Sequence, residues 1–458
     1  MTEIMYAWSA VGGDPARLAR LTTVAREGVL PARLPVRQLA RACVGACGLA
    51  AAELAARRAG LGEVPGVRVD DGAVAAAFHS ERHLRVDGRA PVLFSPLSRF
   101  WRTADGWVRT HANYPHHRAR LLTALDLPRD APAEKAAARL AALSALEAEE
   151  AVCGAGGLAV ALRTPAQWQA HEQAAEVALR PLVEREQLDA APARVLAPLD
   201  PAGAPLLPAA GLRVLDLTRV LAGPVATRTL ALLGADVLRV DAPWLPELPD
   251  QHADTGFGKR SAVLDLAAGR DTFEDLLSAA DVVVSGYRPG ALDRFGLSPR
   301  ELVARRPGLV VAQVSAWGAY GPWGGRRGFD SLVQAATGIA VTEGPAGEPG
   351  ALPAQALDHG TGYLLAAAVL RALTEQSYEG GSRLVRLALA RTAHWLTSGI
   401  GPAPAEGTPY PGPEAWLTGT DSPLGRLRHA RPAVSFTGGP TDWARPPGPW
   451  GSDPARWR

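Results

Sequence analysis

From residue 211 onward, short runs of aliphatic residues alternate with longer stretches of helical pattern. The runs lie at 213–217 (RVLDL), 236–241 (DVLRVD), 281–286 (DVVVSG) and 309–316 (LVVAQVSA). Nearly continuous apolar runs are typical of strands buried on both faces, and strands separated by helices usually pair in parallel. The pattern therefore predicts an α/β fold over 211–400, with a Rossmann-like parallel sheet and helices on both faces.

A second, smaller α+β domain is predicted over residues 96–190. Asp105 and Gly106 form a turn signal between two aromatic, strand-like runs, which indicates a β-hairpin. Alanine-rich helical segments follow as far as about Val183.

Three further segments surround these domains. Residues 1–95 are expected to be mainly helical, with a helix from Pro31 to about Arg58 and a short strand at 67–70. Residues 191–210 are rich in Pro and Ala with almost no charge, and are the expected linker. Residues 401–458, rich in Pro, Gly and Trp, are expected to pack back on the large domain as a tail.

The composition favours a globular protein of more than one domain. The chain has 458 residues, of which 47% are hydrophobic and 21% charged. The net charge is only +2 and no block of Lys and Arg stands out, so nucleic acid is not an expected partner. The N-terminus lacks a signal-peptide pattern and no apolar run is long enough to cross a bilayer. A cytoplasmic protein without a membrane partner is therefore expected.

Neither the cysteines nor the histidines favour a metal site. Cys43, Cys47 and Cys153 are a sparse, odd set, which indicates a reducing compartment rather than a disulfide framework. Cys43 and Cys47 lie one helical turn apart and fit a buried, small-residue helix face better than a metal pair. The three histidines within 111–118 (HANYPHHR) match no standard zinc spacing.

A faint internal repeat links the two ends of the chain. Residues 34–78 and 352–396 share the order Leu-Pro, small-residue helix, short strand and helix. Aligning Leu39 with Leu357 places Ala40 opposite Asp358, so only the second copy carries an acid. Residues 1–95 are thus expected to be a trimmed copy of the end of the large domain.

The stretch 211–243 reads as strand, sharp turn, helix and strand. The turn contains Ala222, Gly223 and Pro224, and the free amides of the following helix could face an anion or a ligand chain. No GxGxxG string is present, so the dinucleotide fingerprint is absent.

This stretch resembles the opening of class III CoA-transferases, the group of formyl-CoA transferase, carnitine CoA-transferase and alpha-methylacyl-CoA racemase. Matching strings follow in the same order at 258–266 (GKRSAVLDL), 280–297 (ADVVVSGYRPGALDRFGL), 315–323 (SAWGAYGPW), 326–344 (RRGFDSLVQAATGIAVTEG) and 356–373 (ALDHGTGYLLAAAVLRAL). By these collinear matches the chain is identified as a member of that family.

The resemblance implies a coenzyme A site built from two loops. The implied CoA-binding residues are Arg219, Val220, Leu221, Ala222, Leu264, Leu266, Tyr287, Arg288 and Arg294. Arg294 suits a phosphate because a guanidinium is always charged, although a solvated surface arginine is an equal reading. Lys259 either steadies the fold or lines the cleft. CoA and acyl-CoA are expected as substrates, with no permanently bound cofactor.

Asp358 is the acid that the resemblance implies as catalytic. In the resembled transferases the corresponding carboxylate attacks the thioester, expels CoA and becomes a mixed anhydride, which the acceptor acid then exchanges. An ordinary aspartate is ionised at neutral pH, and Gly360 and Gly362 would let an acyl-CoA approach the backbone. A plain helix N-cap is the alternative role. Leu357 stands where the family usually has glycine.

The racemases of this family place a histidine in a Gly-His-Asp string, upstream of the acid. Here the string is Gly328-Phe329-Asp330, so that base is missing, and His359 beside Asp358 could not reach both faces of a substrate carbon. Asp330 is either a second acid lining the site or a helix cap.

The expected function is transfer of CoA from an acyl-CoA to a small carboxylic acid. An acyl-CoA racemase or isomerase and a retired, non-catalytic acyl-CoA-binding protein remain open, the latter because the domain order is rearranged and trimmed. The small domain is expected to cover the Asp358 cleft of its own or a partner chain, and a homodimer is expected by analogy.

Overall fold

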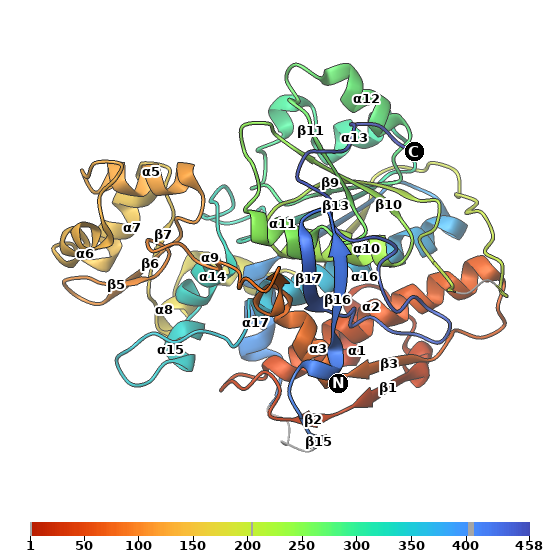
Figure 1. Ribbon diagram of the computed structural model, residues 1–458, viewed down its shortest axis with the longest axis horizontal. Helices are drawn as coiled ribbons and strands as arrows, with labels where there is room; N and C mark the ends of the chain where they lie inside the picture. The colour runs from red at the N-terminus through yellow and green to blue at the C-terminus, as the bar shows by residue number, and fades with distance from the viewer. Residues whose placement is uncertain (1, 203–204, 402–406) are drawn as a thin grey trace.

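A seven-stranded sheet runs through the centre of the molecule, with the order β11-β10-β9-β12-β13-β14-β8 (Figure 1). The strands are β8 (Glu184–Gln187), β9 (Arg213–Leu217), β10 (Asp236–Asp241), β11 (Arg260–Val263), β12 (Val282–Ser285), β13 (Val310–Ser315) and β14 (Arg383–Ala388). All neighbours pair in parallel except β14 and β8. Numbered along the chain from β9, the parallel strands run 3-2-1-4-5-6, the order of doubly wound nucleotide-binding sheets. The computed structural model describes residues 2–202, 205–401 and 407–458.

Helices cover both faces of this sheet, as predicted. Val282 and Val284 of β12 belong to one core, while Val283 between them belongs to the other. A strand sends alternate side chains to opposite faces, so a strand enclosed on both sides must be apolar throughout. The first core includes residues of α2 (Val36–Ala59), α10 (Ala222–Leu232) and α16 (Ala356–Glu379), and the second those of α12 (Arg270–Ser278) and α13 (Pro299–Arg305). The predicted α/β fold is confirmed.

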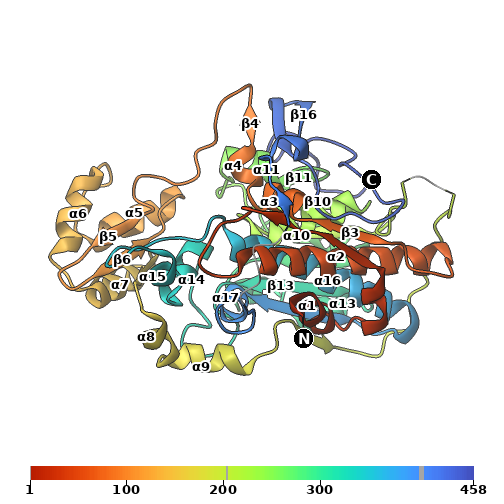
Figure 2. The same ribbon diagram turned by 90° about the horizontal axis from the view of Figure 1, so that it is seen from below.

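The N-terminal segment repeats one unit of the large sheet in miniature. Strands β1 (Leu21–Val24) and β3 (Val67–Asp70) pair in parallel across α2, as β13 and β14 do across α16. The two helices are each 24 residues long, begin after residues with nearly the same backbone angles, and pack along one another (Figure 2). This arrangement supports the repeat.

The apolar character of α2 corrects one expectation. The helix is long and apolar enough to cross a membrane, contrary to the sequence prediction, but 89% of the qualifying window is buried inside the fold. Burial against α16 accounts for its composition, because a helix enclosed on all sides must be apolar all round.

A second, smaller sheet lies to the side of the first (Figure 1). It consists of β5 (Phe100–Arg102), β6 (Trp107–Thr110) and β7 (Ala159–Ala161), all antiparallel. Helices α5 (Pro115–Ala124), α6 (Ala133–Ala141) and α7 (Ala145–Gly154) pack with it around a core of their own. The predicted hairpin is confirmed, because the Thr103 N–H donates to the Gly106 carbonyl at 3.0 Å. Strand β8, although within 96–190, joins the edge of the large sheet.

The remaining segments tie the parts together. Arg58 at the end of α2 donates hydrogen bonds to the carbonyls of Ala197, Pro208 and Ala210 in the Pro/Ala-rich stretch. Strands β4 (Arg85–Val86), β16 (Leu417–Ser422) and β17 (Gly425–Ala430) form a three-stranded sheet. The other elements are α1 (Glu3–Ala10), η1 (Pro15–Arg20), β2 (Arg26–Glu27), α3 (Asp71–Phe78), α4 (Ser80–His83), α8 (Pro165–Gln169), α9 (Glu172–Leu179), α11 (Pro249–Thr255), η2 (Asp293–Phe295), α14 (Asp330–Ala336), α15 (Ile339–Glu343), α17 (Leu389–Ser398), β15 (Thr408–Pro409) and η3 (Glu414–Trp416).

Candidate active site

Asp358 lies in the first turn of α16 and is 7% exposed. Its carboxyl group makes no hydrogen bond with another described side chain or backbone group. Burial, together with the nearby acids Asp330 and Glu81, raises the pKa of Asp358 well above its usual value. Burial and the neighbouring acids thus disfavour the ionised form that would be expected of Asp358 from its residue type alone.

Asp330 holds the backbone of Asp358. Its Oδ2 accepts the N–H groups of Leu357 at 2.9 Å and Asp358 at 3.0 Å, and its Oδ1 accepts a hydrogen bond from Gln334. Burial raises the pKa of Asp330 to about 6, although these hydrogen bonds oppose the shift. Asp330 starts α14 but accepts hydrogen bonds from the free amides of α16, so it caps that helix and lies next to Asp358.

The N-terminal segment places a third acid, Glu81, near this pair. Glu81 of α4 binds His359, with Oε2 3.0 Å from Nε2, and the His359 ring stacks on Phe78. Burial favours the neutral form of Glu81, but the charge and hydrogen bond of His359 outweigh it and lower the pKa of Glu81. His359 Nδ1 is enclosed without a hydrogen-bond partner. Sequence reasoning did not single out Glu81, because no local pattern marks it.

The two helical glycines after Asp358 serve packing rather than an open ligand path. A Cβ on Gly362 would lie 2.5 Å from the Ala222 carbonyl oxygen, and one on Gly360 would lie 3.4 Å from Cys43 Sγ. These glycines therefore let α10 and α2 approach α16 closely. The expected approach of an acyl-CoA over these two glycines is therefore wrong, because α10 and α2 already occupy that space.

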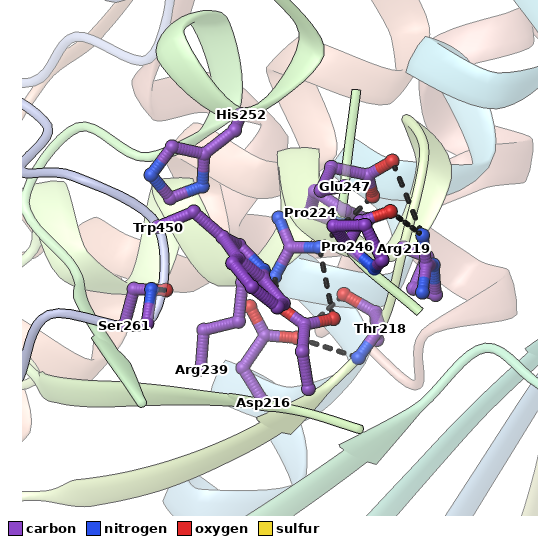
Figure 3. Close-up of polar contacts among 12 residues, drawn as sticks. Asp216, Thr218, Arg219, Pro224, Arg239, Pro246, Glu247, His252, Ser261 and Trp450 are labelled. Atoms are coloured by element: carbon purple, nitrogen blue, oxygen red, sulfur yellow. Dashed lines mark hydrogen bonds and ion pairs between the residues drawn. The ribbon is translucent and has the colours of Figure 1, made fainter. Parts of the chain in front are cut away.

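The loop after β9 is held under strain. Val220 has a φ of 72°, a left-handed conformation that a β-branched residue rarely adopts, and its N–H donates to Glu247 at 3.1 Å. Arg219 donates to the carbonyls of Leu245 and Pro246, the second of which is labelled in Figure 3. Its guanidinium also lies over the Tyr114 ring. Leu221 and Ala222, also predicted CoA-binding residues, are buried where α10 begins.

A buried ionic cluster underlies this loop (Figure 3). Lys259 Nζ donates to Asp216 Oδ2 and to the Pro224 carbonyl, both at 3.0 Å. Burial lowers the pKa of Lys259 to about 8, although Asp216 opposes the shift. These contacts join β9 to the first turn of α10. They fit the predicted role of Lys259 in steadying the fold rather than in lining the cleft. Trp450 from the C-terminal tail donates to Asp241 beside the cluster, at 2.9 Å.

The loop after β12 meets the loop after β9 where the strand order reverses. Ligands of doubly wound sheets usually bind at this point, at the carboxyl ends of the strands. Tyr287 and Arg288 line a cavity of about 40 Å³ there, and Arg288 is exposed. Tyr287 shares a core with Leu264 and Leu266, so three predicted residues are brought together. Arg294 is exposed, with its guanidinium 4.6 Å from the Phe295 ring centroid.

The small unit, formed by β5 to β7 and α5 to α7, touches the β9 loop and the segment before Asp330. Tyr114 donates a hydrogen bond to Glu247 beneath the β9 loop. His111 lies flat on Phe329, with ring centroids 3.7 Å apart, one residue before Asp330. The small unit is therefore packed against the large sheet of its own chain. His111 and His117 are buried. In the described part of the chain no group of three or more His, Cys, Asp or Glu side chains is arranged to hold a metal ion.

Residues 209–413 match the family model of CoA-transferase family III. This segment belongs to that family. A curated relative, an acetyl-coenzyme A transferase (nodX) of Hypoxylon pulicicidum, is 37% identical over 206 residues, which cover 43% of this chain and 35% of that protein. A probable fatty acyl-CoA transferase (Rv3272) of Mycobacterium tuberculosis is 35% identical over 205 residues, covering 41% and 52%.

The crystal structure of Rv3272 aligns with a TM-score of 0.40 and 35% identity, over 43% of this chain and 58% of that one. The chain therefore spans between about a third and just over half of these relatives. All the predicted CoA-binding residues and both acids of α14 and α16 lie inside the family III segment. Glu81, His111 and Tyr114 lie outside it, so the family motifs could not have revealed them. The aromatic and histidine-rich run at 111–118 is a local signal for the last two of them.

Proposed function

We propose that the chain transfers CoA from an acyl-CoA to a small carboxylic acid, with Asp358 as the group that takes up the acyl chain. The observation that carries this proposal is a slightly exposed carboxyl group that has no hydrogen-bond partner among the described residues and lies beside a second acid, within a CoA-transferase family III segment. An aspartate kept only for structure would normally be hydrogen-bonded at this degree of burial.

The chemistry needs no cofactor. A carboxylate oxygen of Asp358 attacks the thioester carbon, the C–S bond breaks and CoA leaves as a thiolate, which leaves a mixed anhydride on Asp358. The acceptor carboxylate then attacks the aspartyl carbonyl carbon and expels the donor acid, and the CoA thiolate attacks the acceptor's acyl carbon in the new anhydride, which breaks its C–O bond and releases the Asp358 carboxylate. The amino end of α16 favours negative charge at Asp358, while Asp330 occupies two of its amides.

Mass spectrometry after incubation with a panel of acyl-CoAs tests the proposal. An acyl or CoA adduct on Asp358 that hydroxylamine removes is the expected result, and Asp358→Asn should show none. An adduct-free protein that still binds CoA would favour the retired binder. A structural role for Asp358 would be indicated if Asp358→Asn transferred CoA as fast as its parent.

A second candidate, an acyl-CoA racemase or isomerase, draws support from one contact. His111 of the small unit stacks on Phe329, so an imidazole lies beside the position where racemases carry their histidine. Burial lowers the pKa of His111 to about 3, so the ring is neutral but a weak base, which counts against proton abstraction by His111. Deuterium incorporation at the α-carbon of an acyl-CoA in deuterium oxide, abolished in His111→Phe, would favour this candidate over transfer.

A further inference from the structure

A cavity of about 510 Å³ lies between the small unit and the segments that pack beside it. Part of its wall is formed by Trp107 of β6 and by the first turns of α7. The rest comes from α8, from His171 and from the loop that carries Trp323 and Arg326. Helix α8 lies beside the small unit in both ribbon views (Figures 1 and 2). Cavities of roughly 300–1,000 Å³ are typical of small-molecule sites.

This cavity lies at the other end of β6 from the acid pair. Trp107 begins the strand and His111 directly follows it. Because a strand advances about 3.3 Å per residue, the Cα atoms of these two residues lie roughly 13 Å apart. His111 lies on Phe329, the residue before Asp330, so only this far end of the strand meets the acid pair's segment. Neither Asp330 nor Asp358 is among the described residues that line the cavity.

One end of the cavity is rich in hydrogen-bond donors. Arg163 and Arg326 each form an ion pair with Glu149 through Nη1, both at 2.9 Å. The two guanidiniums also lie over the Trp323 ring, at 5.1 and 4.6 Å from its centroid. Among the described residues, Nε and Nη2 of both arginines have no hydrogen-bond partner. His171 Nδ1 accepts a backbone N–H at 3.0 Å, so Nε2 of the neutral ring carries the proton.

This donor-rich end has one positive charge in excess. Burial opposes the charge of Glu149, but Arg163 outweighs burial and lowers the pKa of Glu149. One ionised carboxylate therefore faces two guanidiniums. A guanidinium can bind two carboxylate oxygens at once, and a single carboxylate would balance the excess charge, whereas a doubly charged phosphate would exceed it.

The other end of the cavity is apolar, with acids beside it. Leu146 lines the cavity near Trp107 and is 56% exposed, so a ligand could cover it. Asp105 and Glu150 also line the cavity and are exposed. The Asp105 carboxylate accepts the N–H of Ala145, which places it next to Leu146. These acids would repel a second negative charge on a ligand.

We propose that this cavity binds a monocarboxylic acid with an apolar body. The carboxylate would lie against Arg163 and Arg326, and the body along Trp107 and Leu146. The site is separate from the acid pair, so its ligand would bind there without being acylated. The proposal therefore does not depend on CoA transfer at Asp358.

Isothermal titration of the full-length protein with octanoate tests this site. 1-Octanol has a chain of the same length without the charge, and suberate carries a second carboxylate at its far end. Both should bind at least about 10-fold more weakly than octanoate, because one lacks the charged acceptor and the other meets the exposed acids.

Arg326→Gln should weaken octanoate binding roughly 10- to 100-fold, because charge-assisted hydrogen bonds are lost. Leu146→Gln should weaken it roughly 3- to 10-fold through the lost apolar contact, and serves alone if the Arg326 variant does not fold. Arg139→Gln is the matched control, since Arg139 lies in α6 of the same unit with its side chain 56% exposed. Asp358→Asn controls for octanoate bound at the acid pair. Both controls should bind octanoate as tightly as the parent.

The proposal would be overturned if the parent bound octanol or suberate as tightly as octanoate, or bound no octanoate at millimolar concentration. Octanoate affinity that is unchanged in both Arg326→Gln and Leu146→Gln would also overturn it. Loss of octanoate binding in Asp358→Asn would place the ligand at the acid pair and exclude the separate site.

Discussion

Asp330 accepts the backbone N–H of Asp358 at 3.0 Å, although the two acids are 28 residues apart in the sequence. The carboxylate at the start of α14 thus closes the amino end of α16, and two acids come to lie close together in a buried site. Like charges in such a place cannot both ionise easily, so the pair is expected to keep a proton that a lone aspartate would lose.

Asp330→Asn should separate the two consequences of this contact. The charge of Asp330 raises the pKa of Asp358, so its removal should lower that pKa and let Asp358 react at lower pH. An amide oxygen still accepts the α16 N–H bonds, so the loss of stability should be small, about 1 kcal/mol. The rate of Asp358 acylation from pH 5 to 8 and urea unfolding measure both effects. If the acylation rates of the variant and its parent showed the same pH dependence near pH 5, Asp330 would not act on Asp358 through its charge.

The parent itself should acylate faster as the pH rises from 5 to 8. Only the ionised form of Asp358 is a nucleophile, its pKa is raised by burial and by its neighbours, and Asp330 titrates near 6. The rate of adduct formation, quenched and followed by mass spectrometry at each pH, tests this. A rate of adduct formation that stays constant from pH 5 upward would mean that Asp358 is already ionised at pH 5 when acyl-CoA binds.

Folding stability should depend on pH in the opposite sense. A group whose pKa is raised in the folded state contributes stability that is present below its unfolded pKa and lost as the pH rises through the folded pKa. For Asp358 that loss should begin above about pH 4. At pH 8 the free energy of unfolding of Asp358→Asn, measured with urea, should therefore exceed that of its parent by ~1 kcal/mol or more. At pH 4 the difference should be smaller. Equal pH dependence of the two proteins would contradict this.

The parallel sheet could be predicted because its information is local. Strands buried on both faces are apolar throughout, and RVLDL and DVLRVD coincide with β9 and β10. The site could be predicted only in part. Asp358 lies inside a family string, but Glu81 comes near the acid pair through packing between segments distant in sequence, which no periodicity records. The raised pKa of Asp358 likewise arises from neighbours that only the fold supplies.

Glu81→Gln tests whether the N-terminal segment belongs to the site. Glu81 raises the pKa of Asp358 and is the partner of His359, so its neutral analogue should lower the pH at which Asp358 reacts. Weakening a buried, charged hydrogen bond should also lower the free energy of unfolding by about 1–3 kcal/mol. Glu63→Gln is the control, since Glu63 pairs with Arg20 while 80% exposed, and should change stability by less than ~0.5 kcal/mol. If Asp358 acylation showed the same pH dependence in Glu81→Gln and Glu63→Gln, Glu81 would have no effect on the reactivity of Asp358.

The two lysines of the chain, Lys135 and Lys259, allow a direct test of the structural role of one of them. Lys259→Met removes the ammonium that neutralises Asp216 and leaves a buried carboxylate unpaired, so it should lower the free energy of unfolding by roughly 3–5 kcal/mol. Lys135→Met, at an exposed position, should have no measurable effect. Urea unfolding and CoA binding are measured for both. Because the Lys259 ammonium is bound by Asp216 and Pro224, CoA affinity should fall only under conditions where part of the Lys259→Met protein is unfolded. A fully folded Lys259→Met protein with weakened CoA binding would make Lys259 a ligand of CoA instead.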